Sequence, residues 1–188
     1  MLHPSTHIEF INNEIGHGVF ATQRIPKGTI TWVFDCLDRE MTPAEMERLP
    51  DLVQETALTY SYRNAKGNFI LCWDLTRYVN HSFSPNCMIT PYGFEIAIAD
   101  IEPGDQLFND YGTLNILEPF TPLESSPKRT SVYPNDIETF HNQFDERIQN
   151  AMFQLPFVHQ PLKKLIDETT WNEAMNVAQG RSTSKSIL

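Results

Sequence analysis

The 188-residue sequence lacks long apolar runs and is poor in basic side chains. No stretch approaches the roughly 18 consecutive apolar residues that a membrane-spanning helix needs. Fourteen Lys and Arg stand against 24 Asp and Glu, which gives a formal net charge of -10. Because a surface this acidic repels phosphate, the composition argues against direct binding of nucleic acid and against a polybasic membrane anchor. A basic peptide or protein is the partner that such a charge attracts.

Cysteine is also scarce, since Cys36, Cys72 and Cys87 stand far apart and form no CxxC pair. Three isolated thiols cannot make a four-thiolate zinc site, and they do not match the disulfide framework of a secreted protein. The first residues lack the basic and apolar regions of a signal peptide. We therefore expect a soluble intracellular protein, cytoplasmic or nuclear, whose cysteines are small buried apolar residues.

Short apolar stretches separated by Gly, Pro, Asn and Asp fill the chain as far as about residue 112. Those rich in β-branched and aromatic residues predict strands at 8–11, 18–21, 29–34, 69–73 and 94–99. One helix interrupts this region. Thr42 and Glu45 form a capping box around Pro43, which predicts a helix from Pro43 to near Pro50, followed by a helical turn over 52–58.

The pattern becomes helical after a proline-rich connector. Apolar residues then recur every three or four positions and share one helix face, namely Ile137, Phe140, Phe144, Ile148 and Met152. Asn135 is the expected cap, a second helix is expected from Pro161, and a third from about Thr170 to Gly180. The sequence thus predicts a β-rich body over 6–118, the connector over 119–134, a helical segment over 135–180 and a disordered tail over 181–188.

Three segments carry residue types that suggest chemistry. Two glycines in residues 16–21 let a backbone turn tightly and approach a ligand, although a plain hairpin turn has the same pattern. Residues 77–87 hold a cluster of Asn, His and Ser between apolar strands, whose buried polar groups must find partners in the protein or in a ligand. Residues 104–112 place Tyr111 at the end of a strand, where a tyrosine can also simply pack against the core.

Taken in this order, the three segments resemble the motifs of SET-domain protein lysine methyltransferases. Residues 16–21 are similar to the family's first glycine motif, and residues 77–87 to its Asn-His-Ser…Pro-Asn-Cys motif. Residues 104–112 are similar to its Gly-Glu-Glu-Leu…Asp-Tyr-Gly motif, with Asp105 and Gln106 in place of the two Glu. The resemblance covers roughly residues 6 to 115. It implies a mainly β SET-domain fold, with small twisted sheets around a pseudoknot, followed here by a C-terminal α-helical appendage.

The resemblance also implies an activity, the transfer of a methyl group from S-adenosylmethionine to the ε-amine of a lysine in a protein substrate. Tyr111 is then the catalytic tyrosine. The cofactor-binding residues are Gly16, His17, Gly18, Asn80, His81 and Phe120, with Phe120 stacked on the adenine. Phe34 and Asn109 are expected to line the substrate channel, with core packing an equal alternative for Phe34. Arg77 and Asp110 are expected to pair or cap within the pseudoknot.

Two departures from the family's pattern matter. Residues 118–129 contain no cysteine where many relatives have a zinc-bound flap, so we expect no metal and take the helical appendage as the candidate for the missing channel wall. Asn109 stands where relatives have Phe or Tyr. A wider channel favours several methyl additions, whereas a water held by the amide favours one. We expect a di- or trimethylated product.

Two other functions compete with this interpretation. A catalytically weak relative could grip cofactor or peptide as a binding module and act as a scaffold or homodimer through its C-terminal helices. A metal-dependent hydrolase using His17 and His81 is disfavoured, because no carboxylate stands at ligand spacing beside either histidine. For the enzyme, the expected partner is a protein with an exposed lysine in a basic context, without nucleic acid or membrane.

Overall fold

The computed structural model describes residues 1–123, 126 and 129–188, so four residues of the expected connector, at 124, 125, 127 and 128, lie outside it. The strands are β1 (Thr6–Asn12), β2 (Gly16–Ala21), β3 (Ile30–Val33), β4 (Arg39–Met41), β5 (Ser61–Arg63), β6 (Phe69–Leu71), β7 (Asn80–His81), β8 (Cys87–Ile89), β9 (Phe94–Ala97) and β10 (Phe108–Asn109). The helices are α1 (Pro43–Met46), α2 (Asp51–Tyr60), α3 (Asp136–Met152) and α4 (Glu168–Ala178). Short 3₁₀ turns are η1 (Leu75–Tyr78), η2 (Tyr111–Thr113), η3 (Leu155–Phe157) and η4 (Lys163–Leu165).

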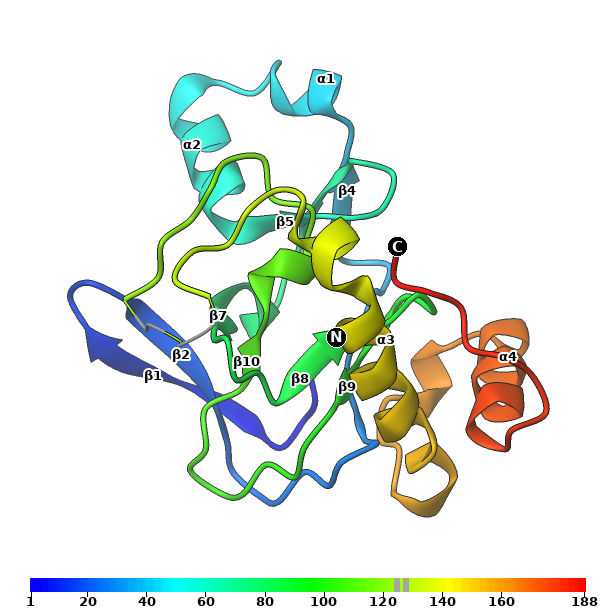
Figure 1. Cartoon of the computed structure of the whole chain (residues 1–188). Coiled ribbons are helices and arrows are strands. Elements are labelled where there is room, and N and C mark those ends of the chain that lie inside the picture. The colour runs from blue at the N-terminus through cyan, green and yellow to red at the C-terminus, as the bar shows by residue number, and fades with distance from the viewer. Residues whose placement is uncertain (124–125, 127–128) are drawn as a thin grey trace.

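The strands of the described residues form four small sheets (Figure 1). This confirms the small-sheet fold that the resemblance implies. The β1–β2 hairpin, the β3–β9–β8 sheet and the β4–β6–β5 sheet are antiparallel, whereas β7 and β10 pair in parallel. Helices α1 and α2 stand with the β4–β6–β5 sheet as a lobe above the rest of the molecule (Figure 1). The predicted capping box is present, since Thr42 Oγ1 accepts from Glu45 N and Glu45 Oε2 accepts from Thr42 N.

The parallel pair produces the expected pseudoknot. Phe108 lies opposite Asn80, and the backbone N–H of Ser82 donates to the carbonyl of Asn109 at 2.9 Å. Asn86 holds the two segments together, because its Oδ1 accepts from Phe108 N and its Nδ2 donates to Gln106 O, both at 2.8 Å. An amide side chain that hydrogen-bonds two backbone groups of another segment fixes where that segment passes. The chain entering Tyr111 is therefore threaded beside the Asn80 loop.

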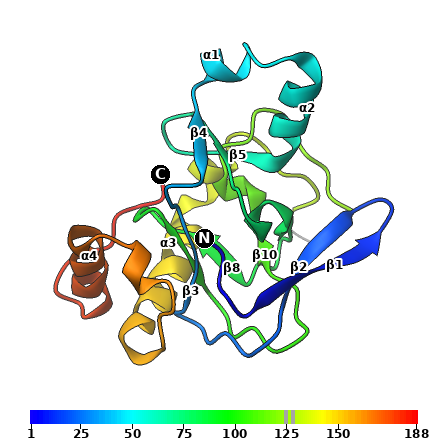
Figure 2. The same cartoon turned by 180° about the vertical axis from the view of Figure 1, so that it is seen from behind.

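The helical segment covers the β3–β9–β8 sheet on the side away from the α1–α2 lobe (Figure 2). The predicted apolar stripe of α3 is confirmed, since Ile137, Phe144, Ile148 and Met152 are buried. Ile148 and Met152 share one core cluster with Phe94 and other sheet residues. Burial of each such side chain contributes about 1.5–3 kcal/mol, so the stripe is used within the chain and does not itself require a second copy.

Three expectations about the C-terminal helices are wrong. The segment from Pro161 forms only the turn η4, and its Leu162 and Ile166 pack onto the core without a continuous helix. The last helix begins earlier than expected, at Glu168, since Asp167 Oδ1 accepts from Thr170 N at 3.0 Å and supplies the cap. The side chain of Asn135 makes no capping hydrogen bond, and only its carbonyl accepts from the helix.

The last residues are packed where the sequence predicts a disordered tail. The backbone N–H of Lys185 donates to the hydroxyl of Tyr92 at 3.1 Å. Asp145 on α3 accepts from Ser186 Oγ at 2.6 Å and from Ile187 N at 2.8 Å, and Ile187 packs against the core. The polar composition of the segment concealed these contacts, which depend on a carboxylate and a tyrosine far away in the sequence.

Two further findings concern the composition. Cys72 and Cys87 are buried as predicted, but Cys36 is exposed, because it follows β3 in a surface turn. Within the part of the chain that the structure describes, no helix is long and apolar enough to span a membrane.

Candidate active site

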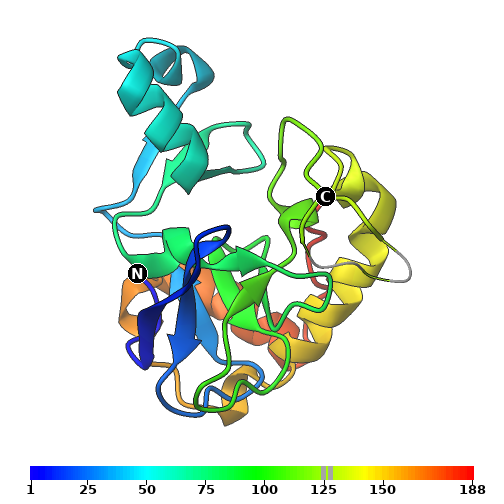
Figure 3. The ribbon, with the colours of Figure 1, turned by 90° about the vertical axis from the view of Figure 1, so that its left-hand side faces the viewer.

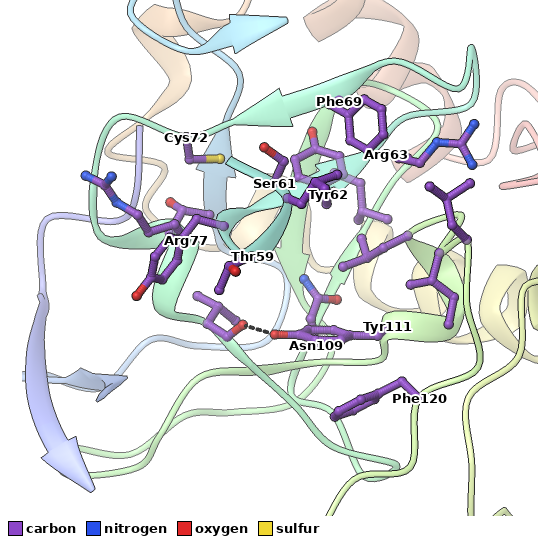
Figure 4. A pocket seen from close by; sticks show the side chains of 18 of the residues that line it. Thr59, Ser61, Tyr62, Arg63, Phe69, Cys72, Arg77, Asn109, Tyr111 and Phe120 are labelled. Atoms are coloured by element: carbon purple, nitrogen blue, oxygen red, sulfur yellow. Dashed lines mark hydrogen bonds between the residues drawn. The ribbon is translucent and has the colours of Figure 1, made fainter. Parts of the chain in front are cut away.

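A cavity of about 490 Å³ lies between the α1–α2 lobe and the pseudoknot. In Figure 3 the cyan lobe stands on one side of this region and the yellow-green segment after Tyr111 on the other. One wall is formed by the end of α2 and by β5, over residues 58–63. Another is formed by Leu114, Ile116, Leu117, Glu118 and Phe120. Trp32, Asn109 and Tyr111 also border the cavity, whose lining is mostly apolar (Figure 4). Such an environment disfavours a charged amine that enters it.

Tyr111 lies at one end of the cavity, where η2 begins. Asp110 starts that turn, because its Oδ1 accepts from Gly112 N at 2.9 Å. The Tyr111 hydroxyl donates to the carbonyl of Val79 at 3.0 Å, as the dashed line in Figure 4 shows. Burial raises the pKa of Tyr111 to about 12, so the phenol is protonated at neutral pH. The cavity is thus bordered by two oxygens, one from a hydroxyl and one from a carbonyl.

The structure brings the first and second motifs together beside this end of the cavity. Asn80 Nδ2 donates to the carbonyl of His17 at 2.9 Å, which ties the glycine turn to β7. Gly16 has a φ of +82°, which favours glycine. A side chain at Gly18 would place its Cβ 2.5 Å from Gln106 Nε2, so glycine allows β2 to lie against the third motif.

The aromatic residues gather around His81. The backbone N–H of Tyr111 donates to His81 Nδ1 at 3.1 Å, and the two ring centroids are 5.4 Å apart. Phe120 is expected to stack on a cofactor ring. Its ring centroid lies 5.9 Å from that of Tyr111 and 5.8 Å from that of His81. The predicted catalytic and cofactor-binding residues therefore form one contiguous group, of which Tyr111 and Phe120 border the cavity itself.

Phe34 lies outside this group and outside the cavity, whereas the resemblance predicts that it lines the substrate channel. It lies beyond the end of β3, is 39% exposed and borders a separate crevice with Tyr92 and Leu165. Trp32, two residues earlier, is buried and lines the cavity instead. The sequence marks both as aromatic residues of one strand, but it does not show where the strand ends.

The helical appendage does not form a wall of the cavity, contrary to expectation. Helices α3 and α4 pack on the β3–β9–β8 sheet, and no residue beyond Phe120 lines the cavity in the part of the chain described. Leu114, Ile116 and Leu117 provide the wall. Across residues 1–123, 126 and 129–188, no group of three or more His, Cys, Asp or Glu side chains is placed to hold a metal ion.

Asp110 pairs with a residue that sequence reasoning missed. Its carboxylate contacts Arg129 Nη1 at 2.5 Å, and Arg129 Nη2 contacts Asp136 at the start of α3, also at 2.5 Å. This network joins the pseudoknot to the helical segment. Arg77 instead donates to the carbonyls of Trp73 and Asp74, at 2.7 and 3.2 Å, and borders the cavity.

Glu95 is the second residue that sequence reasoning missed. It lies in the apolar strand β9, is only 3% exposed and borders the cavity. Its carboxyl accepts from Thr31 Oγ1 at 2.7 Å and from Asn109 Nδ2. Burial raises its pKa to about 7, although these hydrogen bonds oppose the effect. A charged residue in an otherwise apolar strand was the available signal, but its partners are invisible in the sequence.

The SET domain family matches residues 16–112, just over half of the chain, and that range contains all three motifs. No curated protein matches the chain significantly. Among solved structures, the crystal structure of a Plasmodium falciparum "putative histone methyltransferase" is 20% identical, covers 58% of this chain and 95% of its own, and has a TM-score of 0.41.

Proposed function

Because the chain belongs to the SET-domain family, we propose that it is a protein lysine N-methyltransferase with S-adenosylmethionine as methyl donor. The observation that carries the proposal is the pair of oxygens at the end of the cavity, the Tyr111 hydroxyl and the Val79 carbonyl, 3.0 Å apart. A sulfonium methyl group is polarised, and oxygen acceptors aimed at its C–H bonds align it for in-line transfer.

The residues present fit this donor. When bound, S-adenosylmethionine supplies an electrophilic methyl group on a positively charged sulfur. Arg77 borders the cavity, and a guanidinium is a suitable partner for the donor's carboxylate. Phe120 and Tyr111 offer ring faces for an adenine, with planes inclined by 35°. Gly16, His17 and Gly18, joined to Asn80, would hold the amino-acid and ribose end through backbone groups.

The chain's own residues also account for activation of the lysine. A lysine has a reference pKa near 10.4, so deprotonation at pH 7 costs roughly 4.6 kcal/mol. The apolar lining, including Trp32 and Leu114, disfavours the ammonium form and lowers this cost. Tyr111 stays protonated and directs its hydrogen to Val79, so the hydroxyl lone pairs remain available to the methyl group.

The substrate class follows from charge. With a net charge of -10, the chain attracts a lysine in a basic segment of a protein more strongly than one in an acidic segment. Histones and other basic proteins belong to this class.

The test is incubation with labelled S-adenosylmethionine and a panel of basic proteins, together with Tyr111→Phe. Removal of the hydroxyl should lower turnover about tenfold or more and leave folding and donor affinity intact. Tyr133→Phe, which changes a tyrosine outside the cavity, is the matched control and should keep wild-type turnover. Unchanged turnover in Tyr111→Phe contradicts the proposal. Binding of donor and peptide without any transfer would identify a binding module instead.

A further inference from the structure

The end of the cavity holds a carboxyl without a cationic partner. No ion pair to Glu95 is formed by residues 1–123, 126 or 129–188, and the side chain borders the cavity beside Asn109. A carboxyl removed from water costs free energy unless other groups satisfy it. The hydrogen bonds that Glu95 accepts offset part of this cost.

Two donors from neighbouring strands hold the carboxyl. Thr31 Oγ1 on β3 and Asn109 Nδ2 on β10 both donate to it. An ionised carboxylate only accepts hydrogen bonds, so this set suits the charged form of Glu95. It also determines the orientation of the Asn109 amide, which must turn its NH₂ group toward Glu95.

The oxygen of the Asn109 amide is not used by these hydrogen bonds. Asn109 Oδ1 is buried and has no hydrogen-bond partner among the described residues, although the side chain borders the cavity next to Tyr111 (Figure 4). A buried acceptor without a donor is unfavourable until a donor arrives. The N–H of a substrate amine in the cavity is a donor of the required kind.

We propose that Glu95 is a positioning residue of the lysine channel, whose ionised carboxylate holds Asn109 Nδ2 and thereby presents Asn109 Oδ1 to the N–H of the substrate amine. The inference rests on the proposed function. A hydrogen bond from the amine to Oδ1 directs one N–H away from the donor methyl and helps to aim the nitrogen lone pair. No bond other than hydrogen bonds forms or breaks at Glu95.

Protonation of Glu95 reverses this polarity. A neutral carboxyl can donate to Asn109 Oδ1, and the amide then turns its NH₂ group into the cavity. Two amide N–H groups then face the N–H groups of the substrate amine, and no acceptor is left for the amine at this position. Binding of the amine is therefore weaker. The polarity of the channel end is therefore linked to one proton.

The surroundings let Glu95 change its charge near neutral pH. Burial raises its pKa to about 7. The titratable groups that face it are Cys87 on β8, Cys72 after β6 and Tyr62 on β5. Burial raises the pKa of all three, so they are neutral over the same range. The flanking strands β3 and β10 contribute only the uncharged Thr31 and Asn109, and α3 packs on the same sheet with apolar side chains.

The first experiment compares the pH dependence of kcat/KM for wild type and Glu95→Gln, with the lysine peptide varied. In the wild type, kcat/KM should rise with a midpoint near pH 7 as Glu95 ionises. This rise adds to the increase with pH that deprotonation of the substrate lysine itself causes. The glutamine amide donates to Asn109 Oδ1 as the protonated carboxyl does, so Glu95→Gln should lose this rise and fall about tenfold at pH 8. Affinity for S-adenosylhomocysteine, measured by calorimetry, should not change. Glu102→Gln, an exposed carboxyl far from the cavity, is the control and should behave as wild type.

A double-mutant cycle tests whether Glu95 acts through Asn109. In an Asn109→Ala background, Glu95→Gln should cause no further loss of kcat/KM. A full additional loss there, or a wild-type pH profile in Glu95→Gln, overturns the inference. If Glu95→Gln does not fold, ¹³C NMR of the Glu95 carboxyl in the wild type decides, because a titration that does not coincide with the rise in rate contradicts the inference. A wild type without any methyl transfer refutes the proposed function, which is a different outcome.

Discussion

Replacement of Glu95 by Gln should make the folded state progressively more stable than the wild type as the pH rises. Glu95 ionises near 4.5 when unfolded, but burial raises its pKa to about 7 in the folded state. Between these values the folded protein keeps a proton that the unfolded chain has lost. An increase in pH therefore favours unfolding of the wild type, and glutamine removes this dependence.

The size of the effect follows from the two pKa values. Stability contributed by the protonated carboxyl is fully present below pH 4.5 and is lost as the pH rises toward 7. Between pH 5 and pH 8, this linkage lowers the free energy of unfolding of the wild type by about 2–3 kcal/mol relative to Glu95→Gln. A constant offset from altered hydrogen bonds to Thr31 and Asn109 cancels when the two pH values are compared.

The assay is urea unfolding followed by circular dichroism at pH 5, 6, 7 and 8, with linear extrapolation to water. Glu40→Gln is the matched control, because Glu40 is an exposed glutamate on β4 whose pKa is lowered by hydrogen bonds from Asn68 and Asn64. Its replacement should have a small effect of the opposite sign, which disappears at low pH. A stability difference between wild type and Glu95→Gln that stays constant from pH 5 to pH 8 would refute the reasoning.

Two further predictions address the donor site and the number of methyl groups added. Asn80→Ala removes the hydrogen bond to His17 O that ties the glycine turn to β7. Calorimetry should therefore show donor binding that is weaker by about 1–3 kcal/mol. Undiminished affinity would mean that this hydrogen bond does not shape the donor site. We expect di- or trimethyl product from the wild type, because Asn109 leaves more room than Phe or Tyr, and a shift toward monomethyl product in Asn109→Tyr. Mass spectrometry of a methylated peptide under excess donor measures the product. A wild-type reaction that stops at one methyl group contradicts this expectation.

Much of the fold could be predicted because its signals are local. The Thr42–Glu45 capping box lies within four residues and defines the start of α1. The stripe from Ile137 to Met152 follows from helical periodicity alone. The order and spacing of three short motifs indicate the family without any knowledge of their contacts. For the capping box and the helical stripe, the physical cause acts between neighbours in the chain, so the sequence records it directly.

The site depended on contacts that no local pattern records. Glu95 and Asn109 belong to different strands, and each acquires its partner only when the pseudoknot places β10 beside the sheet that contains β9. Asp110 pairs with Arg129 in the connector, where the resemblance had suggested a pairing or capping role within the pseudoknot together with Arg77. A buried polar group takes whichever donor or acceptor the tertiary fold brings within about 3 Å. The sequence by itself therefore determined which motifs meet, and the tertiary structure decided which side chains face the cavity and in which orientation.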